Sequence, residues 1–152
     1  MQATLNDTEL AQFRAFALGG DILHTEVALT TAEILAIYTT PKELVATPGT
    51  KYVHEFISAV LILDYVSVAY TTRGDLTVRE NTGSGTALSD TVSAADLVQK
   101  GADSVRVMQA LSADVTLLPG SSLVLCCATG NPVVGDSPIR DKVAYRTHPT
   151  GL

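Results

Sequence analysis

The stretch Val115–Arg146, VTLLPGSSLVLCCATGNPVVGDSPIRDKVAYR, decides the fold class of this 152-residue chain. An apolar run is followed by a cluster of turn-forming residues and then by a second strand-like run. This order is typical of two strands joined by a long turn. Its unbroken apolar part, Leu123–Ala128, predicts a strand buried in a core. The stretch contains no recognisable reactive group, so the residues predict a β-rich domain without indicating an activity.

Composition supports the same class. The chain is 46% hydrophobic and 17% charged and has no Trp, which favours strands over helical bundles. A single domain of this length buries roughly 70% of the surface that its unfolded chain exposes, enough for a core without disulfides or metal. The net charge of −6 argues against nucleic acid as a partner.

The N-terminus predicts a helix from Asn6 to Gly20, capped by Asn6 or Asp7 and ended by Gly19-Gly20. We therefore expect residues 1–20 to form an N-terminal extension with a short helix and residues 21–152 to form one β-sandwich domain. The start lacks the features of a secretory signal, and no apolar run approaches the roughly 20 residues of a membrane span. We expect a soluble protein made in a cytoplasm, with no membrane partner.

Two further short helices are expected inside the domain. Thr30 and Glu33 form a capping box followed by about two helical turns that end near Thr40, and Ser93–Asp96 begins a helix that ends at Gly101. The expected strands are Ile22–Leu29, Lys42–Thr47, Tyr52–Ala69, Leu76–Glu80, Ser104–Leu111, Asp114–Leu118, Ser122–Thr129 and Lys142–Arg146. About eight strands with two or three short helices predict an all-β fold, an antiparallel β-sandwich or jelly roll.

The long strand that begins at Tyr52 is apolar on both faces until Asp64. Ile57, Ala59, Leu61 and Leu63 share one face, and Val60 and Ile62 lie on the other. Such a strand is either central in the sheet or covered by a neighbouring subunit. The same alternatives, a buried core strand or a subunit contact, apply to Leu123–Ala128, and both hold in an obligate oligomer.

No catalytic, cofactor-binding or metal-binding residue is predicted, and we expect the protein not to be an enzyme. His24, His54 and His148 lack the spacing of metal ligands, and His148 lies in a tail expected to be exposed. The adjacent Cys126 and Cys127 point to opposite faces of a strand, which is poor geometry for a disulfide, so they are expected to be small buried groups. Aspartates at 90, 96, 103 and 114 do not match a calcium loop and are expected to serve as structural caps.

Two motifs in the chain suggest a family. Leu29–Gly49, LTTAEILAIYTTPKELVATPG, contains the pattern L-T-x-A-x-I, T-T-P and L-V-A-x-P-G, and Cys126–Arg146 closes with N-P-x-x-G-D-S and V-x-Y-R. Both motifs, together with SVAYTTRGDLTV between them, resemble small virion proteins of tailed bacteriophages, the capsid decoration or cement proteins. The segment Asp75–Leu111 matches the pattern least.

The resemblance implies a β-sandwich that binds the outer surface of an assembled capsid, often as a homotrimer, and helps to hold the shell together. The implied partners are the major capsid protein and other copies of the chain. The implied location is the virion, after synthesis in the bacterial host cytoplasm. Residues 1–20 are the candidate for an arm that grips the shell or a neighbouring subunit.

Two other hypotheses remain. The first is a receptor-binding or glycan-binding module on a tail or head fibre, because jelly rolls commonly serve as lectins. The second is a hydrolase, which only the presence of Ser, His and Asp supports, since no G-x-S-x-G elbow is present. We favour the structural virion protein over both.

Overall fold

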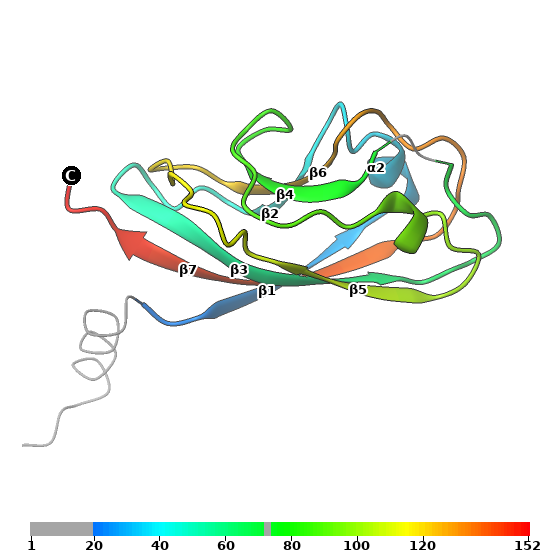
Figure 1. Cartoon of the computed structure of the whole chain (residues 1–152), viewed down its shortest axis with the longest axis horizontal. Helices are drawn as coiled ribbons and strands as arrows, with labels where there is room; N and C mark the ends of the chain where they lie inside the picture. The colour runs from blue at the N-terminus through cyan, green and yellow to red at the C-terminus, as the bar shows by residue number, and fades with distance from the viewer. Residues whose placement is uncertain (1–19, 72–73) are drawn as a thin grey trace, which may run out of the picture.

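The computed structural model describes residues 20–71 and 74–152, and Figure 1 shows its strands as two layers. Sheet A has the order β1 (Leu23–Leu29), β7 (Ile139–Pro149), β3 (Tyr52–Leu63) and β5 (Ser104–Gln109). Sheet B has the order β2 (Lys42–Val45), β6 (Leu123–Cys127) and β4 (Leu76–Glu80), and every pairing in both sheets is antiparallel. The all-β antiparallel sandwich is confirmed, with seven strands in the described residues where about eight were predicted.

Helical structure is sparse in the described part of the chain. The helix α2 (Thr31–Leu35) and the 3-10 turn η1 (Ala94–Asp96) connect strands. Neither is long and apolar enough to cross a membrane. The helix predicted from Asn6 lies outside the described residues except for Gly20.

The strand β6 forms the centre of sheet B and is buried along its whole length, as predicted. Leu123, Leu125 and Cys127 join the hydrophobic core between the sheets. The opposite face is also covered, because Gly83 lies close to the side chains of Pro41 and Cys126. Both cysteines are buried and neither forms a disulfide, as expected for small core groups.

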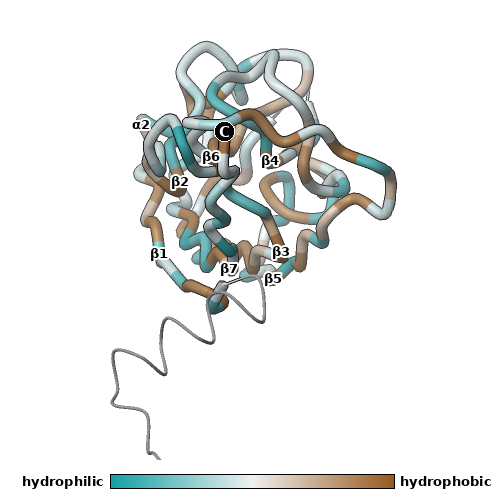
Figure 2. Tube along the Cα trace, turned by 90° about the vertical axis from the view of Figure 1, so that its left-hand side faces the viewer, coloured by the Kyte–Doolittle hydropathy of each residue, from teal (hydrophilic) through white to brown (hydrophobic). Residues whose placement is uncertain are grey.

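The strand β3 lies inside sheet A between β7 and β5, which agrees with the first of the two predicted alternatives, a central strand. Its side chains do not keep one alternation, because a bulge between Phe56 and Ser58 shifts the register against β7. His54 and Phe56 are buried before the bulge, and Ala59, Leu61 and Leu63 after it. The prediction that Ile57 shares a face with Ala59, Leu61 and Leu63 was therefore wrong. Figure 2 shows hydrophobic and hydrophilic segments alternating along the strands of sheet A.

Several predicted boundaries also need correction. The strand predicted at Asp114–Leu118 is absent, and this segment runs without strand partners while Leu118 N donates to Glu80 Oε1 at 3.0 Å. The helix predicted from Ser93 is only the turn η1, because Asp75 Oδ1 accepts from Ala94 N at 2.9 Å and Ser93 makes no cap bond. The strand β3 ends at Leu63 and not at Ala69, because side chains bind the backbone that follows it.

Candidate functional site

The two family-like motifs meet in the structure at the side chain of Asn131. Asn131 Oδ1 accepts from Tyr38 N at 2.8 Å and from Thr39 N at 3.2 Å, and Asn131 Nδ2 donates to Thr39 Oγ1 at 3.2 Å. The T-T-P sequence after α2 is thus held by the turn that precedes β7. This contact joins segments more than 90 residues apart, so the two motifs form one structural unit.

Residues of the first motif also cap the N-terminus of α2, the helix that this motif contains. The capping box is confirmed, because Thr30 N donates to Glu33 Oε2 at 2.8 Å and Glu33 N donates to Thr30 Oγ1 at 3.3 Å. Glu33 also forms an ion pair with Lys42 at the start of β2. The hydrogen bond from Lys42, together with those from Thr30, lowers the pKa of Glu33 to about 2.

The acidic end of the 131–137 turn holds the segment that follows β3. The Asp136 carboxylate accepts from Ser67 Oγ, from Ser67 N at 3.1 Å and from Val68 N at 2.9 Å. These bonds, the one from the Ser67 hydroxyl first, lower the pKa of Asp136 to about 2. Ser137 Oγ accepts from Val66 N at 3.0 Å. The polar residues of this motif are therefore occupied in binding backbone.

Gly135 lies beneath the ring of Tyr70. The backbone of Gly135 has φ +102, and a Cβ atom there would lie 2.3 Å from Tyr70 Cδ1. Tyr70 is 1% exposed, and its hydroxyl donates to the Ser137 carbonyl at 2.7 Å. The glycine of the motif is thus explained by a close approach of backbone to an aromatic ring.

Replacing Asn131 with alanine should lower the free energy of unfolding by about 1–2 kcal/mol, because the amides of Tyr38 and Thr39 lose their acceptor. Asn131→Asp keeps an oxygen acceptor at the same place and is the matched control. Urea denaturation followed by circular dichroism measures both variants. Equal losses for the two would show that the acceptor is not what matters.

The outer face of sheet A carries a group of branched apolar side chains, here called the apolar patch. It consists of Val60 and Ile62 on β3 and their register partners Val107 and Val105 on β5. Val105 and Val107 are each 54% exposed, and no other element of the described chain packs over this face (Figure 1). The patch extends without a break over two neighbouring strands. Single exposed valines are common on protein surfaces, whereas a contiguous apolar patch often marks an interaction site.

Charges beside the patch are already paired within sheet A. Lys142 Nζ lies 3.6 Å from Glu26 Oε2, and Arg140 Nε lies 3.1 Å from Asp64 Oδ2. Paired charges around an apolar centre resemble the rim of a protein interface.

The second candidate site is a hollow of about 290 Å³, here called the groove, at the edge of β3. The strand β3 pairs with β7 along its whole length but with β5 only over Ser58–Leu63. The chain after β5 leaves β3 at Ile57, where Ala110 N donates to the Ile57 carbonyl at 3.2 Å, and returns at Tyr52, whose carbonyl accepts from Gly120 N at 2.9 Å. Residues 110–117 therefore bow away from half of β3 and leave the groove between.

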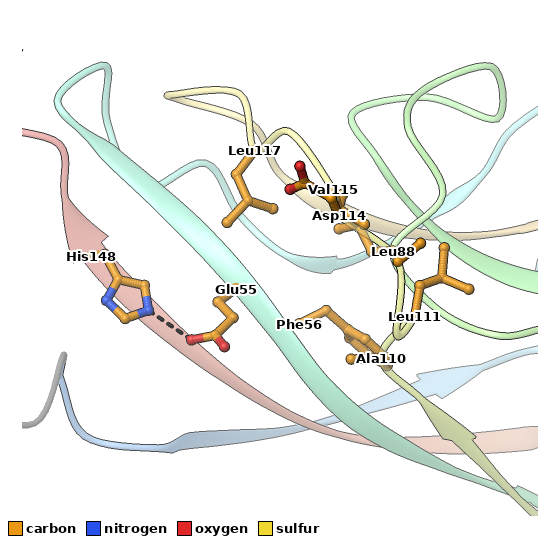
Figure 3. Close-up of a pocket in the computed structure, with 10 residues that line it drawn as sticks. Glu55, Phe56, Leu88, Ala110, Leu111, Asp114, Val115, Leu117 and His148 are labelled. Carbon is orange, nitrogen blue, oxygen red and sulfur yellow. Dashed lines mark hydrogen bonds and ion pairs between the residues drawn. The ribbon is translucent and has the colours of Figure 1, made fainter.

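The walls of the groove are mainly apolar. Figure 3 shows Leu117 pointing toward the strand that carries Glu55 and Phe56, and Leu111 and Val115 also line the groove. Asp114 lies at the rim, and its carboxylate makes no ion pair or hydrogen bond with the described residues. The groove thus combines an apolar hollow with one unpaired acidic group.

Glu55 forms the polar side of the groove with residues of β7. His148 Nε2 lies 2.7 Å from Glu55 Oε2, and Arg146 Nη1 lies 3.7 Å from the same oxygen (Figure 3 shows the former). The expectation that His148 is exposed in a tail was wrong, because β7 extends to Pro149 and pairs His148 with Val53. The sequence separation of Glu55 and His148 left no local signal of this pair.

The structure does not bring the three histidines together. His54 is buried and bonded to the Ala46 carbonyl at 2.8 Å and to Thr147 Oγ1 at 3.0 Å, while His24 lies exposed on β1. Within residues 20–71 and 74–152, no group of three or more His, Cys, Asp or Glu side chains could hold a metal ion. Asp90 and Asp103 accept from the backbone amides of Gln109 and Tyr65, both at 2.8 Å, so these two serve as structural acceptors.

Sequence reasoning missed Asp141. It lies on the buried face of β7 with Val27 and Leu61 as register partners, is 0% exposed, and neither carboxylate oxygen has a hydrogen-bond partner among the described residues. Burial raises the pKa of Asp141 to about 7. Asp141 lies directly before the strand predicted at Lys142–Arg146, and the sequence gave no hint of its face because the register was unknown.

The fold defines the chain as an antiparallel β-sandwich protein. No protein-family model and no curated protein sequence matches the chain. A chain of the solved structure described as the cyanophage Pam1 capsid asymmetric unit aligns with 19% identity and a TM-score of 0.47, covering 84% of this chain and 85% of that chain. A likeness at this level assigns neither a family nor a function.

Proposed function

We propose that this chain is a structural, non-enzymatic virion protein that decorates and cements a tailed-phage capsid. In this proposal it binds the major capsid protein on the outer surface of the shell as an oligomer, a homotrimer, and has no nucleic-acid or membrane partner. The resemblance of both motifs to capsid decoration proteins supports it. Their contact through Asn131 gives the shared residues a common structural purpose.

The apolar patch on the outer face of sheet A is the observation that carries the proposal. Several large apolar side chains exposed together on one face cost free energy in water. Binding of a partner over this face would remove that cost. On a capsid lattice the same contact is repeated at every local symmetry axis, so that weak contacts of a symmetric oligomer add up. We assign the patch to the contact with the shell.

Co-sedimentation with undecorated capsids tests this assignment. Val105→Asp combined with Val107→Asp should weaken capsid binding at least about tenfold, because charged groups would be buried in the contact. Val66→Asp is the matched control, since Val66 is 62% exposed but lies in the loop after β3. The assignment fails if the double variant binds like the wild type.

Electron microscopy of intact particles separates this function from the glycan-binding alternative. Decoration predicts density for this chain over the head lattice at symmetric positions. Density confined to the tail or to fibres, together with binding on a glycan array, would replace the proposal with the receptor-binding module.

A further inference from the structure

The groove is built for an occupant of limited size. Its volume of about 290 Å³ lies at the lower end of ligand pockets, which begin at about 300 Å³, so it suits one or two side chains better than a large cofactor. Phe56, Leu111, Val115 and Leu117 supply apolar walls, and filling the hollow would remove these walls from water (Figure 3).

The negative charge of Asp114 at the rim of the groove indicates which side chains an occupant should carry. Glu55 is already engaged by His148 and Arg146, whereas Asp114 has no ion partner among the described residues. A matching segment would carry a large apolar side chain beside a basic one.

The chain itself contains such a segment. Residues 10–16 read LAQFRAF, with Arg14 directly after Phe13, and Arg14 is the only Lys or Arg before Lys42. The chain enters the described body at Gly20, where an added Cβ would lie 3.1 Å from the Thr147 carbonyl. Thr147 precedes His148, which lines the groove, so the segment leaves the body close to a groove end.

We propose that the groove binds residues 10–16 of a second copy of this chain, with Phe13 in the apolar hollow and Arg14 against Asp114. Exchange of an identical element between copies is a low-cost route to an oligomer. The inference rests on the self-association in the proposed function and names the surface that provides it.

Photo-cross-linking in the full-length chain tests the location. The photoreactive residue p-benzoylphenylalanine replaces Phe13, and chains with natural and heavy nitrogen isotopes are mixed before irradiation. Mass spectrometry should find cross-links to residues 111–117 that join a light chain to a heavy one. Cross-links within one chain, to another surface, or to coat protein alone when capsids are added would overturn the proposal. The same group at Gln2 is the control and should not label the groove.

A charge exchange tests the pairing by sedimentation velocity. Arg14→Glu and Asp114→Arg should each weaken self-association about tenfold, and the double variant should recover most of the loss. Glu43→Arg, an exposed acid on β2 far from the groove, is the control for net charge. A double variant as weak as the sum of the single variants would reject the Arg14–Asp114 contact.

These outcomes are separable from failure of the proposed function. A protein that self-associates and binds capsids through Val105 and Val107 without labelling the groove loses only this inference. A protein that labels the groove between copies but ignores capsids keeps the inference and loses the capsid contact.

Discussion

Gly135→Ala is expected to lower the free energy of unfolding by about 3–5 kcal/mol, a large share of the roughly 5–15 kcal/mol typical of a domain. A non-glycine residue at φ +102 is strained, and the added Cβ would overlap the Tyr70 ring at 2.3 Å. The ring cannot move freely, because Tyr70 is buried and its hydroxyl is bonded to the Ser137 carbonyl. Thermal and urea unfolding measure the loss.

Gly49→Ala separates backbone strain from overlap. Gly49 has φ +96, but its Cβ would approach the nearest atom, Tyr52 Cδ2, only to 4.0 Å, so we expect about 1–2 kcal/mol from strain alone. In a Tyr70→Ala background, Gly135→Ala should cost about as much as Gly49→Ala. If Gly135→Ala costs the same with and without the ring, the contact with Tyr70 does not explain the motif glycine.

Asp141→Asn is expected to remove a pH dependence of about 4 kcal/mol from the stability of the sandwich. The pKa of Asp141 is raised from 3.8 to about 7 by burial, with no hydrogen bond to either oxygen among the described residues. Between these values the folded protein holds a proton that the unfolded chain has released. Raising the pH therefore favours unfolding. The stability that protonated Asp141 contributes is fully present below about pH 3.8 and is lost as the pH rises through about 7.

Comparing the wild type with Asp141→Asn separates the effect of Asp141 from the effects of the other acidic residues. Glu33 and Asp136 have lowered pKa values and act in the opposite sense at acidic pH, but both are present in wild type and variant. Asparagine has nearly the same shape as aspartate and does not titrate. Urea unfolding at pH 4 to 8 should show the wild type losing stability relative to Asp141→Asn, and parallel curves would contradict the prediction.

Features with local causes were predictable from the sequence. The Thr30–Glu33 capping box needs only four consecutive residues, and β4 (Leu76–Glu80) was predicted with its observed ends. The buried strand β6 follows from an unbroken apolar run between turn residues. In each case the physical interaction and the sequence pattern have the same short range.

Features that depend on distant partners were mispredicted. Asp114–Leu118 has strand-like composition, yet it lies in a segment that bows away from β3 between two hydrogen bonds to that strand, at Ala110 and at Gly120. The bulge in β3 moves His54 and Phe56 to the buried face, a shift that no alternation pattern reveals. The helix expected after Ser93 is replaced by a turn that Asp75 caps from the start of the previous strand.

The candidate sites divide in the same way. The N-P-x-x-G-D-S turn was recognisable as a motif, and Val60 and Ile62 were recognisable as excess apolar residues. The local sequence alone shows both. The groove, the Glu55–His148 pair and the orphaned carboxylate of Asp141 were not, because each joins strands through sheet register.

By itself, the sequence determined that the chain forms an antiparallel sandwich around the LVLCC strand, since hydrophobic periodicity and turn chemistry act between near neighbours. Only the tertiary structure decided which face of each strand is buried, that β3 keeps half of one edge open, and that Asp141 lies inside the core. Pairing register is a long-range property, and a shift of one residue reverses every side chain on a strand.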